Sequence, residues 1–488
     1  MAEPGGATHV WDRFLSIAVS HGKKTAIIEP LSGNRITYEE LKNSAVKHCE
    51  LFSHYPIDAI AIIGEPDIDL IPLMLTCAIA NKCFLPLNED EPVSRFLNMF
   101  DQISLNILIL SRHEIKKLSS ISKGTRDLGG KNVFVYLKRT ETTLIKKDPL
   151  YLLTGSSGST GEPKLIKFSQ KTKVKRTDQS INLFRVTSDD VVLSASPMHH
   201  SLGQRHFFVA LLSGATLVKV SPFNPKLWLE AVQTFNVTFA IPVATHLKIL
   251  KPYIDKNPDL LSGLRCLVTS SATADPDLKS RLLQNSSFEL WEIYGMTETA
   301  CATAVQFTSN KNVGHVGRAI EGTRIRINQA DSSESGEIEV LSDCLCDGYI
   351  GNQALWESSL TKDGYFRSGD LGSIDLDNNL AFLGRTSESF ESCGLLVFPA
   401  EIERVAVKIT GVQDCVAFPV PNPIFGNLIG LALVTNASLD QRNILTHLRE
   451  ELPKSKVPAQ LFLRDHFPTL ASGKLDKKRL IQEVLLDN

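Results

Sequence analysis

Short apolar runs separated by helical segments are the feature that most limits how this chain can fold. Residues 59–63, 83–87 and 107–110 are almost wholly apolar. Such a short continuous run is typical of a strand buried on both faces, because a strand with one solvated face alternates apolar and polar residues. The pattern returns at 191–193, 215–220, 237–241 and 264–268. Strand and helix recurring in this order predict an α/β fold with parallel sheets covered by helices.

The size and composition of the chain exclude several classes of protein. At 488 residues the chain exceeds one compact core, so we expect two or three domains. A formal charge of −2 argues against nucleic-acid binding, which favours a strong basic excess. The nine cysteines lack paired C-x-x-C spacing. A reduced, cytoplasmic chain without a structural zinc site fits this usage best.

No segment predicts membrane insertion or export. The first residues lack the basic-then-apolar order of a signal peptide. The most apolar stretch, 70–80, is too short to span a bilayer and is predicted to be a buried helix. Asn81, which follows it, tolerates a left-handed turn.

A loop of Gly, Ser and Thr follows the strand-like run 151–153 and ends in Pro163 and Lys164. Successive N–H groups in such a loop form a concave nest for anions, to which hydroxyls add donors and Lys164 adds a positive charge. We therefore expect it to hold the phosphates of a nucleoside triphosphate. A flexible Gly/Ser linker is the alternative. The apolar flanks, the short length and the closing Pro-Lys count against a linker, and the loop is not a Walker A sequence.

Basic residues continue after this loop, at Lys167, Lys171, Lys173, Lys175 and Arg176. A solvated face is the favoured interpretation of this run. A docking patch for an acidic partner or for nucleotide phosphates is the alternative.

Two further loops follow strand-like runs. One contains His199 and His200, and the other reads Tyr-Gly-Met-Thr-Glu over 294–298. Ligands of α/β sheets gather at the carboxyl ends of strands. The phosphate loop, the histidine loop and the 294–298 loop are therefore expected to share one cleft.

Five motifs occur in an order that resembles the adenylate-forming superfamily of acyl-CoA synthetases, nonribosomal peptide synthetase adenylation domains and firefly-type luciferases. They are the phosphate loop 156–164, then 294–298, 364–370, Gly384-Arg385 and 472–474. The resemblance implies a large N-terminal domain, 1–384, of layered α/β subdomains, and a small mobile α+β domain, 385–488. It also implies that MgATP activates a carboxylate as an acyl-AMP with loss of pyrophosphate, and that a thiol then takes the acyl group.

The resemblance also implies roles for individual residues. Lys474 corresponds to the mobile lysine that bridges the carboxylate and the α-phosphate, where a cation stabilises the transferring centre. Thr297 corresponds to the residue whose hydroxyl contacts the α-phosphate. Glu298 corresponds to the one that helps hold Mg²⁺, a hard cation suited to carboxylate oxygen.

The remaining nucleotide contacts are assigned in the same way. Asp370 matches the ribose-binding aspartate, Arg385 lies where the family contacts ribose or phosphate, and Tyr294 matches the aromatic that packs on adenine. The other expected nucleotide-binding residues lie in three loops: Ser156, Ser157, Gly158, Ser159, Thr160, Gly161 and Lys164; Ser271 and Ala272; and Gly295.

The histidine loop bears on the substrate. Family members that activate α-amino acids place an aspartate there to pair with the ammonium, and this loop has none. The resemblance therefore favours a fatty, aryl or modified acid without an α-amine. His200 aligns with a catalytic histidine of acyl and aryl activators, and a hydrogen-bonded core histidine is the alternative. The expected walls of the acid pocket are His199, Gly203, Gln204, Thr245, Thr299 and Ala300.

The segment after Arg385 departs most from the family pattern. Ser387 stands in place of the usual hinge aspartate, and Glu391 in place of a lysine that faces the site in the second half-reaction. The acceptor is therefore left open between coenzyme A, the default, and a stand-alone acyl carrier protein. A nucleotide-binding regulatory relative without turnover is the alternative function. No feature of the sequence supports luciferase-like chemistry.

Overall fold

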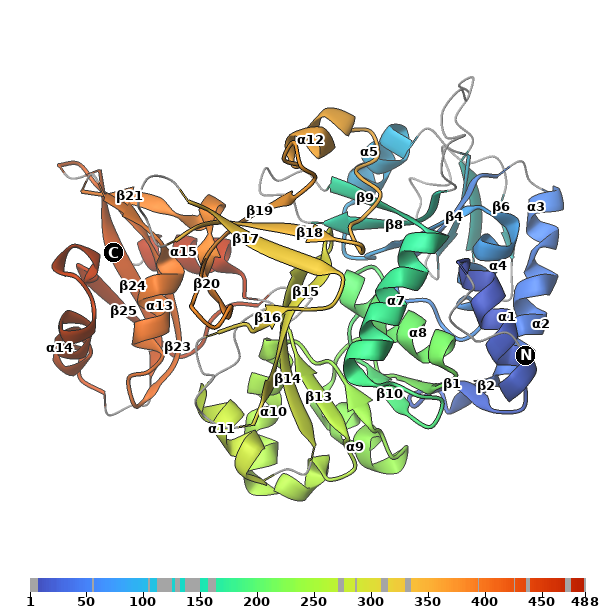
Figure 1. The fold of residues 1–488 in the computed structure, drawn as a ribbon, viewed down its shortest axis with the longest axis horizontal. Helices are drawn as coiled ribbons and strands as arrows, with labels where there is room; N and C mark the ends of the chain where they lie inside the picture. Colours follow the sequence, from blue (N-terminus) through green and yellow to red (C-terminus); the bar gives the residue numbers. More distant parts are fainter. Residues whose placement is uncertain are drawn as a thin grey trace.

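Figure 1 shows the computed structural model of the protein. It describes residues 8–54, 57–103, 106–111, 125–127, 132–136, 150–156, 164–270, 276–285, 288–308, 315–329, 335–393, 395–424, 426–435, 439–469 and 475–486.

A seven-stranded sheet contains the first predicted apolar runs, in the order β6-β7-β5-β3-β4-β8-β9. Strand β3 pairs in parallel with β4 and β5, and β4 pairs in parallel with β8, as predicted. Every residue of β3 is buried, which explains its lack of polar alternation. The strands are β3 (Ala59–Ile63), β4 (Cys83–Leu87), β5 (Ile107–Ser111), β6 (Thr125–Asp127), β7 (Asn132–Tyr136), β8 (Leu150–Ser156) and β9 (Lys164–Ser169).

A nine-stranded sheet contains the later runs, in the order β16-β15-β14-β13-β12-β10-β11-β1-β2. Its centre, from β1 to β14, is parallel, whereas β14 and β15 are antiparallel. The strands are β1 (Thr25–Glu29), β2 (Asn34–Thr37), β10 (Val191–Ser194), β11 (Thr216–Lys219), β12 (Phe239–Ala240), β13 (Cys266–Thr269), β14 (Glu289–Met296), β15 (Ala300–Phe307) and β16 (Arg318–Ala319).

Helices α4 (Pro72–Ala80), α7 (Gln170–Phe184) and α8 (Ser201–Ser213) share the core between these sheets. One core cluster includes Ile60 of the seven-stranded sheet and Phe239 of the nine-stranded sheet, so the two sheets pack as one unit. The other helices of this part are α1 (Val10–His21), α2 (Tyr38–His48), α3 (Glu50–His54), α5 (Val93–Ile103), α9 (Pro225–Thr234), α10 (Ala244–Lys256) and α11 (Pro276–Asn285).

A four-stranded antiparallel sheet leads from this unit toward the C-terminus. It consists of β17 (Thr323–Gln329), β18 (Gly336–Ser342), β19 (Phe366–Ile374) and β20 (Leu380–Arg385), with α12 (Gln353–Ser358) inserted. In Figure 1 these yellow and orange strands lie between the large sheets and the C-terminal elements.

The C-terminal elements form a separate α+β domain with its own cores. Lys248 of α10 and Asp414 form an ion pair of 2.9 Å between it and the larger part. The boundary at 384/385 stays a prediction. The elements are β21 (Phe390–Ser392), β22 (Leu395–Val397), α13 (Pro399–Ala406), β23 (Val412–Asn422), β24 (Gly426–Thr435), α14 (Gln441–Glu451), β25 (Gln460–Arg464) and α15 (Lys477–Leu486).

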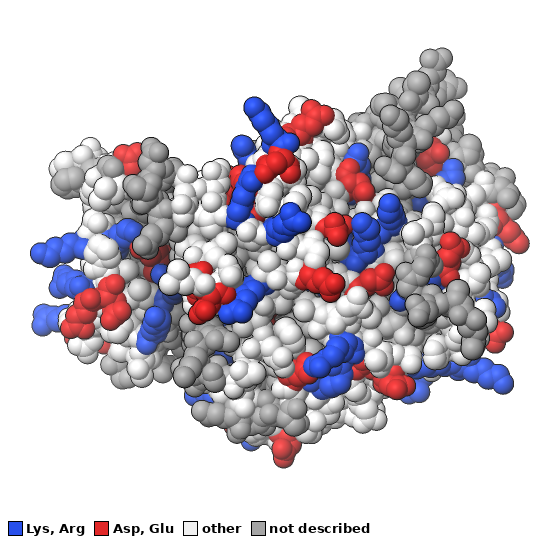
Figure 2. Space-filling view, viewed as in Figure 1, with Lys and Arg blue, Asp and Glu red and all other residues white. Residues whose placement is uncertain are grey.

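The expected buried helix and left-handed turn are confirmed. The stretch 70–80 contains the buried helix α4, which ends at Asn81 in the left-handed conformation, with φ 51°. All nine cysteines are free thiols. Within the described ranges, no helix combines the length and apolar character needed to cross a bilayer. Lysines and arginines intermingle with acidic residues over the face shown in Figure 2.

The interpretation of the basic run after the phosphate loop is only half right. Lys171 and Lys175 are exposed on α7, whereas Lys173 and Arg176 are buried. Residues three apart share a helix face, and here that face packs inward, with both cations 4.4 Å from the centre of the Phe168 ring. The two buried cations belong to the interior, not to a solvated patch.

Gly203 of α8 permits close contact with the preceding loop, because a Cβ there would lie 2.1 Å from the Pro197 carbonyl oxygen. Helix propensity alone favours Ala over Gly by about 1 kcal/mol. The steric conflict outweighs that gain, so Gly203→Ala is expected to destabilise the protein by about 1–3 kcal/mol, measured as a lower thermal unfolding midpoint. Gly263→Ala is the control, since its Cβ would lie 3.7 Å from Val237 O, an ordinary contact. Equal midpoints for the two variants would contradict this packing.

Candidate active site

The phosphate loop lies between two paired strands. β8 and β9 are antiparallel, and Ser156 is the partner of Lys164 at the loop end. The glycines and hydroxyl residues from Ser157 to Gly161, with Pro163, lie outside the described residues. The Lys164 Nζ atom lies 5.3 Å from the centre of the Tyr349 ring, within cation–π range.

Residues 344–350 are here called the crossing segment. They form hydrogen bonds both with β9 and with the turn that contains Thr297 and Glu298. On one side, Lys167 N donates to Gly348 O at 2.9 Å and Asp347 N donates to Lys167 O at 3.0 Å. On the other side, Cys346 N donates to Glu298 O at 2.8 Å. Stretches of chain that are far apart in sequence are thereby held side by side.

The turn carrying Thr297 and Glu298 joins β14 to β15 and is tight. A Cβ on Gly295 would lie 1.9 Å from the Ala300 carbonyl oxygen, so this position requires glycine. Met296 N donates to Thr299 Oγ1 at 3.3 Å across the turn. Thr299 is buried, and Ala300 has a positive φ of 63°. The structure therefore assigns Gly295, Thr299 and Ala300 to the shape of this turn.

The Glu298 carboxylate is oriented by Tyr349. The Tyr349 hydroxyl donates to Glu298 Oε1 at 3.0 Å. Burial, and then the neighbouring Glu298 charge, raise the pKa of Tyr349, so its hydroxyl remains a donor. One aromatic side chain thus contacts both the predicted phosphate-binding Lys164 and the predicted metal-binding Glu298.

Asp370 joins two other predicted nucleotide contacts. The Tyr294 hydroxyl donates to Asp370 Oδ2 at 2.8 Å, and Arg385 Nε lies 3.2 Å from Oδ1. Burial raises the pKa of Asp370, while Arg385 and the Tyr294 hydrogen bond oppose that shift. The Glu388 and Glu298 charges also raise this pKa, by less than burial does. Strands β14, β19 and β20 therefore bring Tyr294, Asp370 and Arg385 together.

The histidine loop begins after β10 and ends at α8, with His200 at the N-cap. The His199 and His200 ring centres lie 4.3 Å apart. Met198 N donates to Glu65 Oε2 at 2.9 Å, so a residue that follows β3 of the other large sheet anchors this loop. Burial lowers the pKa of His199 to about 4, which leaves this ring neutral at pH 7.

The polar atoms of Gln204 are engaged within the protein. Its Oε1 accepts from Lys173 Nζ at 2.8 Å, and its amide nitrogen donates to Thr154 Oγ1 at 2.9 Å and to Met198 O at 3.1 Å. Thr245 differs, because its buried Oγ1 has no hydrogen-bond partner among the described residues. Of these two predicted pocket residues, Thr245 offers an unused polar atom.

Some predicted site residues have no described placement. Ser271, Ala272 and Lys474 lie outside the described residues, as do the phosphate-loop residues from Ser157 to Gly161. The sequence arguments also missed Tyr349, Glu65 and the buried Arg176. None of these lies in a motif, and Arg176 stood among lysines that favoured a surface interpretation.

The comparisons with known proteins cover nearly the whole chain. A family model described as "AMP-binding enzyme" matches residues 15–350, and one described as "AMP-binding enzyme C-terminal domain" matches residues 401–474. The chain is 27% identical to a feruloyl-CoA synthase of Amycolatopsis over 464 residues, which cover 91% of this chain and 93% of that relative.

Two solved structures show the same fold. ATP-bound MatB of Rhodopseudomonas palustris superposes with a TM-score of 0.83 at 22% identity, covering 98% of this chain and 99% of that one. The o-succinylbenzoate coenzyme A synthetase of Bacillus subtilis, in complex with ATP and magnesium, superposes with a TM-score of 0.80 at 21% identity, covering 96% and 99%.

The predicted resemblance, the α/β fold with a separate C-terminal domain and the enzyme class of acid–thiol ligase are all confirmed. The model that matches residues 15–350 spans well over half of the 488 residues. This chain is therefore a member of the AMP-binding enzyme family.

Proposed function

We propose that this protein is an ATP-dependent acid:thiol ligase. It activates a carboxylic acid without an α-amine as an acyl-AMP, releases pyrophosphate, and transfers the acyl group to a thiol. The observation that carries this proposal is the position of Tyr349 between Lys164 and Glu298. Tyr349 contacts both Lys164, a cation at the end of the Gly/Ser/Thr loop, and Glu298, a carboxylate on a tight turn. The binding of a triphosphate together with its counter-cation calls for a cation and a carboxylate held close together.

Adenylation needs charge neutralisation and in-line positioning, because a carboxylate must approach an anionic triphosphate. In this proposal Lys164 and the loop sequence before it bind the phosphates, and the Thr297 hydroxyl binds the α-phosphate. Asp370, held by Tyr294 and Arg385, accepts hydrogen bonds from the ribose hydroxyls.

Mg²⁺ fits the single carboxylate of Glu298. This cation is commonly held by one or two carboxylates together with substrate phosphates. Among the described residues, no cluster of three or more potential ligands exists, which suits a cation that arrives with ATP. Mg²⁺ would neutralise phosphate charge, and Glu298, whose carboxylate accepts from the Tyr349 hydroxyl, would hold it.

Lys474 completes the adenylation site in this proposal. Lys474 belongs to the C-terminal domain, and in this proposal a movement of that domain lets the cation stabilise the transferring centre and then withdraw. His200, the N-cap residue of α8, contacts the acid in this proposal. The neutral ring of His199 adds no charge next to the acid.

The substrate class follows from the charges and free polar atoms near the histidine loop. The loop from Pro197 to Gly203 contains no carboxylate that would pair with an α-ammonium. The buried atoms Thr245 Oγ1 and His246 Nδ1 have no described hydrogen-bond partner, which favours an acid with an oxygen-bearing substituent over a plain aliphatic chain. Because a feruloyl-CoA synthase is among the relatives, aryl acids are the first class to test.

Coenzyme A is the proposed acceptor, and a stand-alone acyl carrier protein is the second candidate. The feruloyl-CoA synthase among the relatives supports the first choice. Glu391 keeps the second open, because it lies exposed on β21 where many family members carry a lysine.

The first functional prediction concerns adenylation itself. At least one acid in a panel of aryl and aliphatic acids is expected to support ATP–pyrophosphate exchange. Lys474→Ala is expected to lower exchange by about 10²-fold or more while ATP still raises the unfolding midpoint. Lys454→Ala, which removes an exposed lysine of the same domain, is the control. Exchange by no acid would refute the ligase, and full exchange by Lys474→Ala would refute the role of Lys474.

The second prediction concerns the buried carboxylate of Asp370. Asp370→Asn keeps the shape but removes the charge that pairs with Arg385 and binds ribose. ATP affinity at pH 7 is expected to fall about tenfold or more, since a hydrogen bond to a charged group contributes roughly 1.5–3 kcal/mol. Isothermal titration calorimetry measures this loss.

The same variant separates function from stability. The pKa of Asp370 is raised above 3.8, so the folded protein binds this proton more tightly than the unfolded chain does. Its stabilising contribution is therefore complete below 3.8 and is lost as the pH rises through the raised pKa. The unfolding midpoint of wild type minus that of Asp370→Asn should decrease between pH 4 and pH 7. An increase over this range would mean that the pKa is lowered.

The third prediction separates the two acceptors. With an acid that supports exchange, the enzyme is expected to form acyl-CoA, detected by mass spectrometry. A panel of holo-carrier proteins is incubated under the same conditions and analysed for a mass increase equal to the acyl group. Acylation of a carrier protein without formation of acyl-CoA would reverse the proposed choice.

A further inference from the structure

Arg176 on α7 donates to three backbone carbonyls that belong to two separate stretches of chain. Its Nη1 donates to Thr297 O at 2.8 Å and its Nη2 to Glu298 O at 2.6 Å. Its Nε donates to Cys344 O at 2.8 Å. The planar fork of a guanidinium fixes the relative positions of its acceptors, which a flexible ammonium does not do. Arg176 thus ties the turn of Thr297 and Glu298 to the start of the crossing segment.

Arg176 is a buried cation whose donors are satisfied within the protein. The side chain is 8% exposed, and burial lowers its pKa. A buried cation is unfavourable unless its donors are satisfied, and here carbonyl oxygens and the face of Phe168 satisfy them. Asp347, the carboxylate whose charge opposes this pKa shift, already accepts from Ser169 N at 2.6 Å and from Thr172 Oγ1 at 2.9 Å.

The carbonyls that Arg176 holds belong to the two residues proposed to contact the α-phosphate and the cation. The Glu298 carbonyl also accepts from Cys346 N, so the guanidinium and the crossing segment converge on one peptide group. When these carbonyls are held, the Thr297 hydroxyl and the Glu298 carboxylate have little freedom to move. The second of these side chains is further oriented by Tyr349.

We propose that Arg176 is a positioning residue for adenylation. It keeps the turn of Thr297 and Glu298 in place against the crossing segment and contacts none of the reactants itself. This inference rests on the proposed ligase function. A displacement of about 1 Å at reacting groups can cost about 10²-fold in rate, so loss of the fork should affect the MgATP step more than folding.

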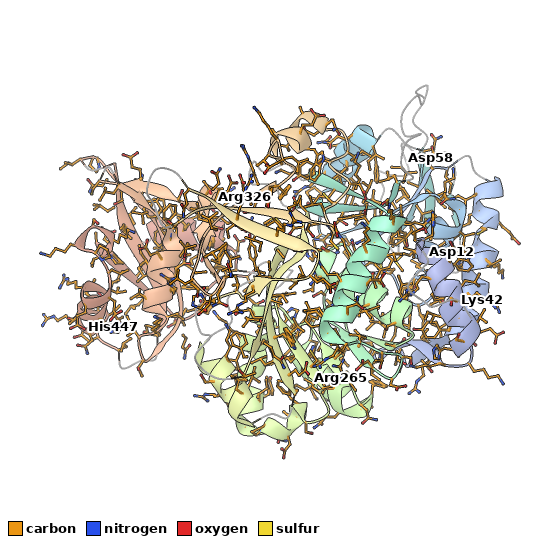
Figure 3. All side chains as sticks on the ribbon, in the orientation of Figure 1. Asp12, Lys42, Asp58, Arg265, Arg326 and His447 are labelled. Carbon is orange, nitrogen blue, oxygen red and sulfur yellow. The ribbon has the colours of Figure 1, made fainter. Side chains whose placement is uncertain are left out.

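The test uses the full chain and variants matched to the geometry. Arg176→Lys keeps the charge and loses the fork, and Arg176→Ala creates space for added guanidinium ion. Arg265→Lys is the control, because Arg265 also binds a carbonyl, Phe184 O, and pairs with Asp190. Arg265 precedes β13 at the amino end of the sheet, near the bottom of Figure 3, away from the carboxyl ends of the strands.

Arg176→Lys is expected to raise the KM for MgATP or lower kcat in pyrophosphate exchange by about 10- to 100-fold in total. It should also reduce the rise in unfolding midpoint that MgATP produces, more than the rise that ATP with EDTA produces. Guanidinium ion should restore part of the exchange by Arg176→Ala and none by Lys474→Ala. Arg265→Lys should lower the unfolding midpoint and leave the KM for MgATP unchanged.

The proposal is overturned if Arg176→Lys retains the wild-type KM, kcat and response to Mg²⁺, or changes them no more than Arg265→Lys does. If Arg176→Lys does not fold, Arg176→Gln, whose planar amide still donates to a carbonyl, replaces it in the same comparison. Failure of the wild-type enzyme to exchange with any acid would refute the proposed function instead. In that case the MgATP-dependent shift in unfolding midpoint alone decides the role of Arg176.

Discussion

The contact between the crossing segment and the Glu298 turn is the constraint on which the rest of the site depends. Backbone hydrogen bonds from residues 344–350 reach β9 on one side and Glu298 on the other, and Arg176 closes the arrangement from α7. The hairpin predicted to bind phosphate and the turn belong to two different sheets that share a core, and this contact joins them directly by hydrogen bonds at the site. Tyr349, which contacts both Lys164 and Glu298, is positioned by the same segment.

The buried charged groups of the site are explained better by binding and positioning than by stability. Burial raises the pKa of Asp370, and Arg385 beside it opposes that shift, at the position where a ribose would need an acceptor. Arg176 and Lys173 are buried cations held by carbonyls, an amide oxygen and the Phe168 ring. Such groups contribute little net stability, because desolvation offsets their interactions. Their placement is better explained by what they hold in position.

Much of the architecture was predictable from local pattern. The run 59–63 is a strand buried on both faces and 70–80 contains a buried helix, because continuous apolar character leaves few other solutions. The basic run after the phosphate loop was harder to interpret. Charge predicts exposure on average, and it does so correctly for Lys171 and Lys175. Lys173 and Arg176 contradict it, since the orientation of α7 between two sheets depends on contacts more than a hundred residues away.

The sequence by itself determined the family and the reaction class, because the identity, order and spacing of the motifs from Ser156 to Lys474 are properties of the chain alone. It also predicts which side chains bind phosphate, ribose and a hard cation, and these assignments stay predictions. Only the tertiary structure decided that Tyr349 orients Glu298 and that Arg176 holds the turn. These contacts join residues 51 and 122 positions apart. Neither local propensity nor charge pattern encodes such a pairing, which exists only once the two sheets, α7 and the crossing segment have packed together.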